Sequence, residues 1–144
     1  MTRARGVLAA LIGVVLVASV SLVAAQENDA RSALPWGDVA PRIEGDRVRV
    51  AALGLVDERI GSWPARRASA RRRGEERARA LLATWLDGHL RGESPSVAAR
   101  AQAAARDAGE VVAVRALADG SAVVVWKVEL APLRAPFDEG RAPF

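Results

Sequence analysis

The sequence predicts an α+β fold, in which a mainly antiparallel sheet of three or four strands carries a long helix and a shorter helix on one face. Three observations lead to this prediction. Residues 47–56 first alternate between polar and apolar side chains and then become apolar, as a strand that enters a core does. Residues 62–90 have a helical pattern. Two strand-like segments, 110–118 and 121–131, flank Asp119-Gly120, a strong hairpin signal.

Residues 1–25 are predicted to be a signal peptide. Two arginines precede an uncharged, apolar run over residues 6–25, and this run ends on small residues that a signal peptidase accepts. Cleavage is therefore expected between Ala25 and Gln26. The alternative is an uncleaved inner-membrane anchor, because about 20 apolar residues can span a bilayer core. In both cases the positive-inside rule places the rest of the chain outside the inner membrane.

The composition excludes several classes of site from the part of the chain that follows the predicted cleavage site. The length of this part suits one small domain, and the two arginines before the cleavage site account for half of the formal net charge of +4. The chain has no cysteine, which excludes disulfides, thiolate metal sites, a cysteine nucleophile and a lipoprotein's lipid-modified cysteine. The expected parts are a polar segment at 26–40, an α+β domain at 41–131 and a flexible, proline-rich tail at 132–144.

A short edge strand is expected before the first long strand. A tight turn around Gly45 would let residues 40–43 pair with the strand at 47–56. Pro41 is tolerated there because an edge strand need not donate every backbone hydrogen bond.

The long helix is predicted to follow Ser62 as its cap, with Pro64 in its first turn, and to end near Gly92. One side carries small residues early and bulky residues late, which would let the helix lie close on a sheet. This side consists of Ala70, Gly74, Ala78, Leu81, Leu82 and Trp85.

The rest of the helix's first half is basic, with seven arginines against Glu75 and Glu76. Guanidinium groups can bind phosphates and carboxylates in a bidentate way, so this surface is the candidate binding site. The alternative is a solvated helix face without a partner. The seven residues are Arg66, Arg67, Arg71, Arg72, Arg73, Arg77 and Arg79.

A second helix is expected at residues 95–108, capped by Ser94 and ended by Gly109. In the last strand, Lys127 and Glu129 point away from an apolar row, so this strand is predicted to cover a core on one face. Two of the four tryptophans, Trp85 and Trp126, are expected in the core. Trp36 and Trp63 are expected to cap its edges, and an aromatic ligand platform is the alternative.

Catalytic residues are sparse. His89 is the single histidine, and a hydrolase would need it beside a serine and either Asp57 or Asp87. No nucleophile-elbow sequence is present. Acid pairs such as Asp57-Glu58 and Asp138-Glu139 form no ligand loop, and no glycine loop for phosphate occurs. We therefore expect no enzyme, no metal and no cofactor.

The stretch 47–90 resembles the LPP-twenty family of small outer-membrane lipoproteins, and is similar to the N-terminal domain of the flagellar H-ring assembly protein. The resemblance rests on a strand that ends in Ala-Leu-Gly-Leu, followed by a helix with recurrent alanines. Pro35-Trp36 and Asp119-Gly120 fit the same arrangement. The resemblance implies a non-enzymatic, envelope-associated protein. Two departures are the missing lipobox cysteine and the arginine-rich helix.

Together these observations predict an accessory or structural domain in the periplasm or at the outer-membrane periphery. Its partner is expected to be an envelope protein or an anionic envelope surface, such as lipid headgroups or lipopolysaccharide, and not nucleic acid. One alternative is a membrane-tethered assembly factor or sensor that keeps its N-terminal helix. Another is a small hydrolase that uses His89.

Overall fold

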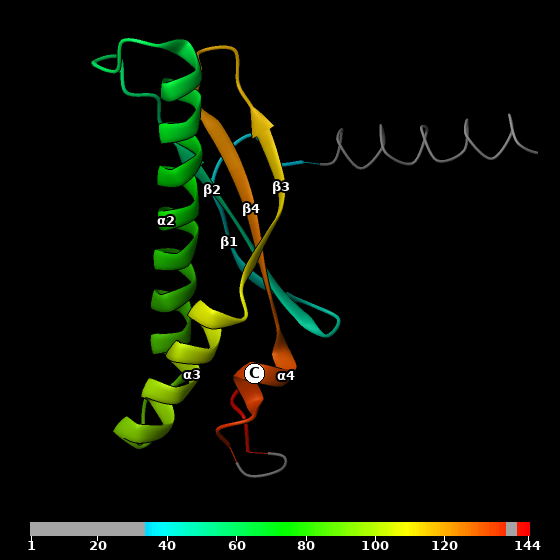
Figure 1. The fold of residues 1–144 in the computed structure, drawn as a ribbon. Helices are drawn as coiled ribbons and strands as arrows, with labels where there is room; N and C mark the ends of the chain where they lie inside the picture. Colours follow the sequence, from blue (N-terminus) through cyan, green and yellow to red (C-terminus); the bar gives the residue numbers. More distant parts are fainter. Residues whose placement is uncertain (1–33, 138–140) are drawn as a thin grey trace, which may run out of the picture. The chain divides into compact units, whose positions relative to one another are not determined.

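Among the residues that the structure describes, 34–137 and 141–144, four strands form one antiparallel sheet in the order β1-β2-β4-β3 (Figure 1). The structure is a computed structural model, in which Pro35–Phe144 forms one unit. The strands are β1 (Val39–Glu44), β2 (Arg47–Gly54), β3 (Glu110–Ala116) and β4 (Ala122–Glu129). The helices are α2 (Trp63–His89), α3 (Pro95–Asp107) and α4 (Leu130–Arg134). The predicted signal peptide and its cleavage site lie outside the described residues.

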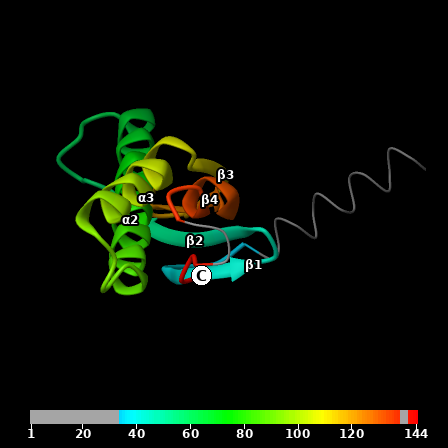
Figure 2. The same cartoon turned by 90° about the horizontal axis from the view of Figure 1, so that it is seen from below.

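The helices α2 and α3 lie on the same side of the sheet, as two views at right angles show (Figures 1 and 2). β2 and β4 are the central strands and pair without interruption from Arg47 opposite Glu129 to Gly54 opposite Ala122. The core lies between these strands and α2. The predicted α+β class is therefore confirmed.

The predicted edge strand is present as β1. A two-residue turn joins it to β2, and Gly45 has a φ of 66°, which glycine adopts without steric cost. Pro41 lies within β1, next to an irregularity in the pairing between Val39 and Arg42. β2 ends at Gly54, two residues earlier than predicted, because the chain there leaves the sheet toward α2.

The long helix begins and ends where its capping residues predict. The side-chain oxygen of Ser62 accepts a hydrogen bond from the backbone N–H of Ala65, with Pro64 in the first turn. Leu90 caps the C-terminus, and Gly92 follows in the left-handed region with a φ of 94°. In the same way, Ser94 caps α3.

Small residues bring the first half of α2 against the sheet. Ala70, Gly74 and Ala78 are fully buried, and a Cβ atom added to Gly54 of β2 would lie 1.8 Å from the Ala70 carbonyl oxygen. The predicted face is right in its first half. In the second half, Leu86 is buried with Leu82, whereas Leu81 and Trp85 are only half-buried.

Both faces of β4 are buried, which differs from the prediction of one buried face. Val123 and Val125 point away from α2 but are 0% and 1% exposed. The reason is that β4 is a central strand, so side chains from its neighbours lie across it. Arg115 of β3 is opposite Val123, and its guanidinium lies 3.9 Å from the ring centre of Trp36.

The described residues after β4, 130–137 and 141–144, pack on the domain, whereas a flexible tail was expected at 132–144. β4 ends at Glu129, and Leu130 and Leu133 of α4 are buried. Phe137 and Phe144 pack against the core, and the Arg134 guanidinium donates two hydrogen bonds to the backbone oxygen of Phe144, at 3.1 and 3.0 Å. Sequence patterns missed this because a five-residue helix is too short to show a periodicity.

Candidate anion-binding surface

The seven arginines of α2 do not form one surface. Six of the side chains contact different neighbours, and these contacts divide the seven arginines into two groups. We call Arg66, Arg73 and Arg77 the clamp arginines, because they hold the segments at 38 and 55–60 against the helix. We call Arg67, Arg71, Arg72 and Arg79 the outer arginines.

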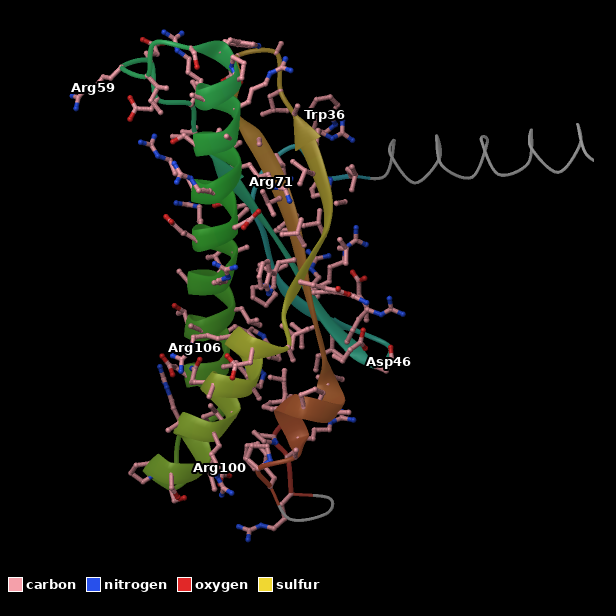
Figure 3. The ribbon with its side chains drawn as sticks, viewed as in Figure 1. Trp36, Asp46, Arg59, Arg71, Arg100 and Arg106 are labelled. Carbon is pink, nitrogen blue, oxygen red and sulfur yellow. The ribbon has the colours of Figure 1, made fainter. Side chains whose placement is uncertain are left out.

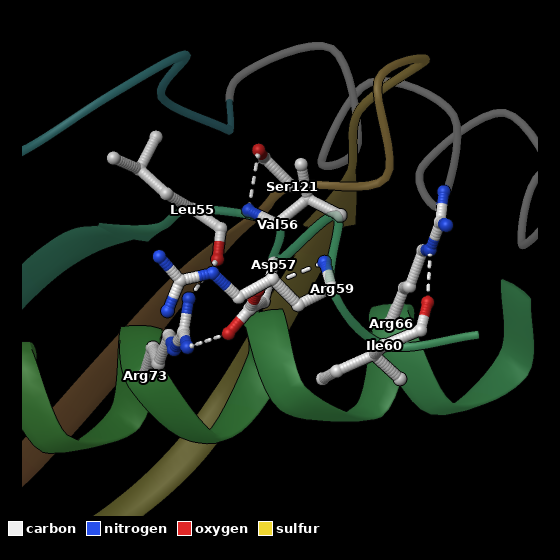
Figure 4. Close-up of polar contacts among 8 residues, drawn as sticks. All are labelled: Leu55, Val56, Asp57, Arg59, Ile60, Arg66, Arg73 and Ser121. Carbon is white, nitrogen blue, oxygen red and sulfur yellow. Dashed lines mark hydrogen bonds and ion pairs between the residues drawn. The ribbon is translucent and has the colours of Figure 1, made fainter. Parts of the chain in front are cut away.

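Two clamp arginines fasten the loop between β2 and α2 (Figure 4). Arg73 donates to the Asp57 carboxylate at 2.6 Å and to the Leu55 carbonyl at 3.4 Å. Arg66 donates to the carbonyl oxygens of Ile60 and Glu58. A loop that is rich in polar groups thus has its backbone acceptors satisfied by α2.

The Asp57 carboxylate is held in its charged form. Hydrogen bonds from the Arg73 side chain and from the backbone N–H of Arg59 lower the pKa of Asp57 below its ordinary value of 3.8. The same loop is tied to the sheet, since the backbone N–H of Val56 donates to the side-chain oxygen of Ser121 at 3.1 Å (Figure 4).

The third clamp arginine, Arg77, binds Asp38 just before β1. Its Nε and Nη2 atoms donate to one carboxylate oxygen at 2.8 and 2.6 Å, and the other oxygen accepts from the backbone N–H of Leu53 at 2.7 Å. Burial acts to raise the pKa of Asp38, but the hydrogen bonds from Arg77 and Leu53 outweigh it and lower the pKa. The ion pair also raises the pKa of Arg77.

Two of the outer arginines lie over tryptophan rings. The guanidinium of Arg67 is 5.2 Å from the ring centre of Trp63, and that of Arg79 is 4.4 Å from the ring centre of Trp126. A cation over an indole face is attracted to it but keeps its full charge. Both arginines are exposed, so they can meet an anion from solvent.

The other two outer arginines differ in their acidic neighbours. Arg71 pairs with Glu75 at 3.0 Å, one turn along the helix. Arg72 is exposed and, within the described part of the chain, makes no ion pair or hydrogen bond. The outer arginines therefore leave at least three cations that no carboxylate neutralises, Arg67, Arg72 and Arg79.

Sequence reasoning placed all seven arginines on one basic face and did not separate these groups. The separation depends on Asp38 and Asp57, which lie in segments distant from their partners along the chain. Helical periodicity carries no signal for such contacts, because it describes only the residues of the helix itself.

The candidate residues of the alternative hydrolase each have other partners. The Nδ1 atom of His89 lies 2.9 Å from the Trp85 carbonyl oxygen, to which it donates, and its ring packs against Trp85 and Phe144. Asp87 accepts from Gln102 at 2.7 Å, and Asp57 is bound to Arg73. In the described residues, neither aspartate is paired with the histidine.

The tryptophans follow the predictions in part. Trp126 is buried in the core, and Trp63 stands at the start of α2 beside the β3–β4 turn, 43% exposed. Trp36 is 73% exposed on the opposite face of the sheet.

Within residues 34–137 and 141–144, no three potential metal-ligating side chains come together. No helix there is both long and apolar enough to cross a membrane.

The chain matches no family model, no curated protein and no solved structure.

Proposed function

We propose that this chain is an exported, non-enzymatic accessory domain of the cell envelope, which binds an anionic envelope component through the outer arginines. The pattern of residues 1–25 supports export to the periplasm or the outer-membrane periphery. The resemblance to the LPP-twenty family supports an envelope role without catalysis. Lipid headgroups, lipopolysaccharide phosphates and acidic protein surfaces share the chemistry that guanidinium groups recognise.

One observation carries the proposal. Arg67, Arg72 and Arg79 are exposed on one helix and have no carboxylate partner among the described residues, while the clamp arginines are neutralised or bound to backbone oxygens. A rigid helix presents these charges at fixed spacing.

The test compares two sets of substitutions. In the first variant, Arg67, Arg72 and Arg79 are replaced by Gln, which removes the unpaired cations. In the matched control, Arg66, Arg73 and Arg77 are replaced by Gln, which removes the same number of charges from the clamp. Co-sedimentation with phosphatidylglycerol vesicles and with envelope fractions is measured at low and at physiological salt.

Binding by the wild type should weaken with salt, because charges at the surface are screened within about 10 Å at 0.1 M ionic strength. The outer variant should lose binding, and the control should keep most of it, provided circular dichroism shows that it is folded. Equal binding by the wild type and the outer variant would refute the proposal.

The apolar run at residues 6–25 also fits a membrane-tethered assembly factor or sensor. The intact mass of protein extracted from the envelope separates this alternative from the first: a mass beginning at Gln26 indicates cleavage. The hydrolase alternative predicts that His89→Ala abolishes function while the fold remains intact.

A further inference from the structure

The sheet has an open edge at β3. In the described residues β3 pairs only with β4, so part of its backbone N–H and C=O groups point outward without a strand to accept or donate. β3 contains no proline. Its pairing with β4 is irregular between Val111 and Ala113 and regular from Ala113 to Ala116.

The side of β3 that faces α2 is only partly covered. Val114 is opposite Val124, whose side chain lies against Gly74 of α2, so Val114 lies on the helix side of the sheet. It is nevertheless 36% exposed, and Val112, at the irregularity in the pairing, is 45% exposed. The cause is that α2 lies over β2 and β4, while β3 lies at the margin of the sheet (Figure 2).

Basic side chains stand beside this uncovered strip. Figure 3 shows Arg71 between α2 and β3. Arg79 lies over Trp126, which is opposite Val111 of β3. The acid of β3 itself, Glu110, is already paired with Lys127 at 3.0 Å. The strip thus combines an exposed valine, an open strand edge and Arg79, a cation that no carboxylate of the described residues neutralises.

The opposite edge of the sheet lacks this combination. β1 contains Pro41, which cannot donate a backbone hydrogen bond, and its pairing is irregular next to that residue. Its start is held by the Asp38–Arg77 ion pair. These features are ones by which proteins block an edge strand against further pairing.

We propose that β3 is a docking edge for a short, extended, acidic segment of a partner protein, which adds to the sheet as a fifth strand beside β3. Main-chain hydrogen bonds to β3 supply binding energy, and alternate side chains supply specificity. On the face of the segment that points toward α2, an apolar side chain packs on Val114 and an acidic side chain reaches Arg79. This inference rests on the proposed function and assigns its anion to a protein.

The probe is a synthetic capped peptide of seven residues, in which glutamate and valine occupy the positions of one face and threonine occupies the alternate positions. Its controls are the same peptide with lysine for glutamate, and one with a central proline. Binding is followed by amide chemical shifts and by hydrogen exchange of the full exported domain. We expect the acidic peptide alone to bind, with slower exchange at amides of β3 and unchanged exchange in β1.

A matched pair of variants tests the edge. Val112→Glu and Ile43→Glu make the same change of charge at valine and isoleucine side chains that are both 45% exposed, one on each edge strand. Val112→Glu should weaken peptide binding by about tenfold or more, while Ile43→Glu should change it by less than about twofold. Circular dichroism checks that both variants are folded. If a variant does not fold, hydrogen exchange of the wild-type β3 amides with and without the acidic peptide still tests the proposal.

Several results would overturn the inference. The lysine peptide could bind equally well, or the acidic peptide could bind without protecting β3. Concentration-dependent self-association that Val112→Glu abolishes would assign the edge to a second copy of this chain. If the peptide fails to bind but the outer arginines still bind anionic vesicles, the docking edge is refuted and the proposed function stands. If the peptide binds and the vesicles do not, the anionic partner is a protein.

Discussion

Replacing Gly54 with alanine tests how closely α2 is docked on the sheet. A Cβ atom at this position would lie 1.8 Å from the Ala70 carbonyl oxygen and 2.4 Å from the Gly74 nitrogen. Ordinary contacts begin near 3.4 Å, so the helix would have to move by more than an ångström. Both neighbours are backbone atoms, which cannot turn aside as a side chain can.

Overpacking of a core typically lowers the free energy of unfolding by about 1–3 kcal/mol. Because the added Cβ atom meets backbone atoms of α2, we expect Gly54→Ala to lower it by about 3 kcal/mol, the upper end of this range. For a domain of this size, each kcal/mol lowers the melting temperature by about 4–8 °C, so a fall of roughly 12–24 °C is expected. Thermal unfolding followed by circular dichroism measures it, with urea unfolding to obtain the free energy.

Gly88→Ala provides the control for this substitution. Gly88 lies within α2, and a Cβ atom there would meet nothing within 4 Å. Alanine favours the helix over glycine, so this variant should be more stable by about 0.5–1 kcal/mol. If Gly54→Ala unfolds at the same temperature as the wild type, α2 does not approach β2 as closely as described, and the packing argument fails.

Three further outcomes are expected. The pKa values of Asp38 and Asp57 are below 3.8 in the folded state, so their contribution to the free energy of unfolding should be fully present above about pH 5 and lost as the pH falls through the lowered pKa values, as acid titration of stability will show. Arg77→Gln should remove the part that belongs to Asp38, whereas Arg72→Gln should leave the same titration unchanged. Ala78→Leu should reduce stability by roughly 1–3 kcal/mol in urea unfolding, because Ala78 is fully buried against the sheet, and an unchanged value would place Ala78 at the surface.

Local signals predicted the helices and the turns well. Ser62 and Ser94, each followed by a proline, mark where α2 and α3 begin, because capping chemistry involves residues that are three positions apart. The turn at Gly45 is equally local, because it depends on a positive φ at one position, which glycine adopts without steric cost. In each case the sequence contains the whole interaction within one short window.

Contacts between distant segments could not be predicted in this way. Arg77 and Asp38 are 39 positions apart, and nothing in either neighbourhood indicates that they meet. The burial of Val123 on the outer face of the sheet depends on how β4 is placed between its neighbours. For the same reason, the sequence showed seven arginines on the helix but did not show which of them bind other segments of the domain.

The side chains of α2 that face the sheet are small in the first half of the helix and bulky in the second, so the space between helix and sheet widens along α2. At Gly74 the helix and the sheet nearly touch, and toward Leu82 and Leu86 they diverge, so that α3 and α4 fill the widening space (Figure 1). The two ends should therefore tolerate mutation differently. At the narrow end an added methyl group meets backbone at Gly54 and the buried Val124 side chain at Gly74, so few residues can change. At the wide end, where flexible side chains meet one another, larger and smaller apolar residues can replace each other with mutual adjustment. Sequence drift in this domain should accordingly collect at its wide end, while the narrow end keeps its glycines and alanines.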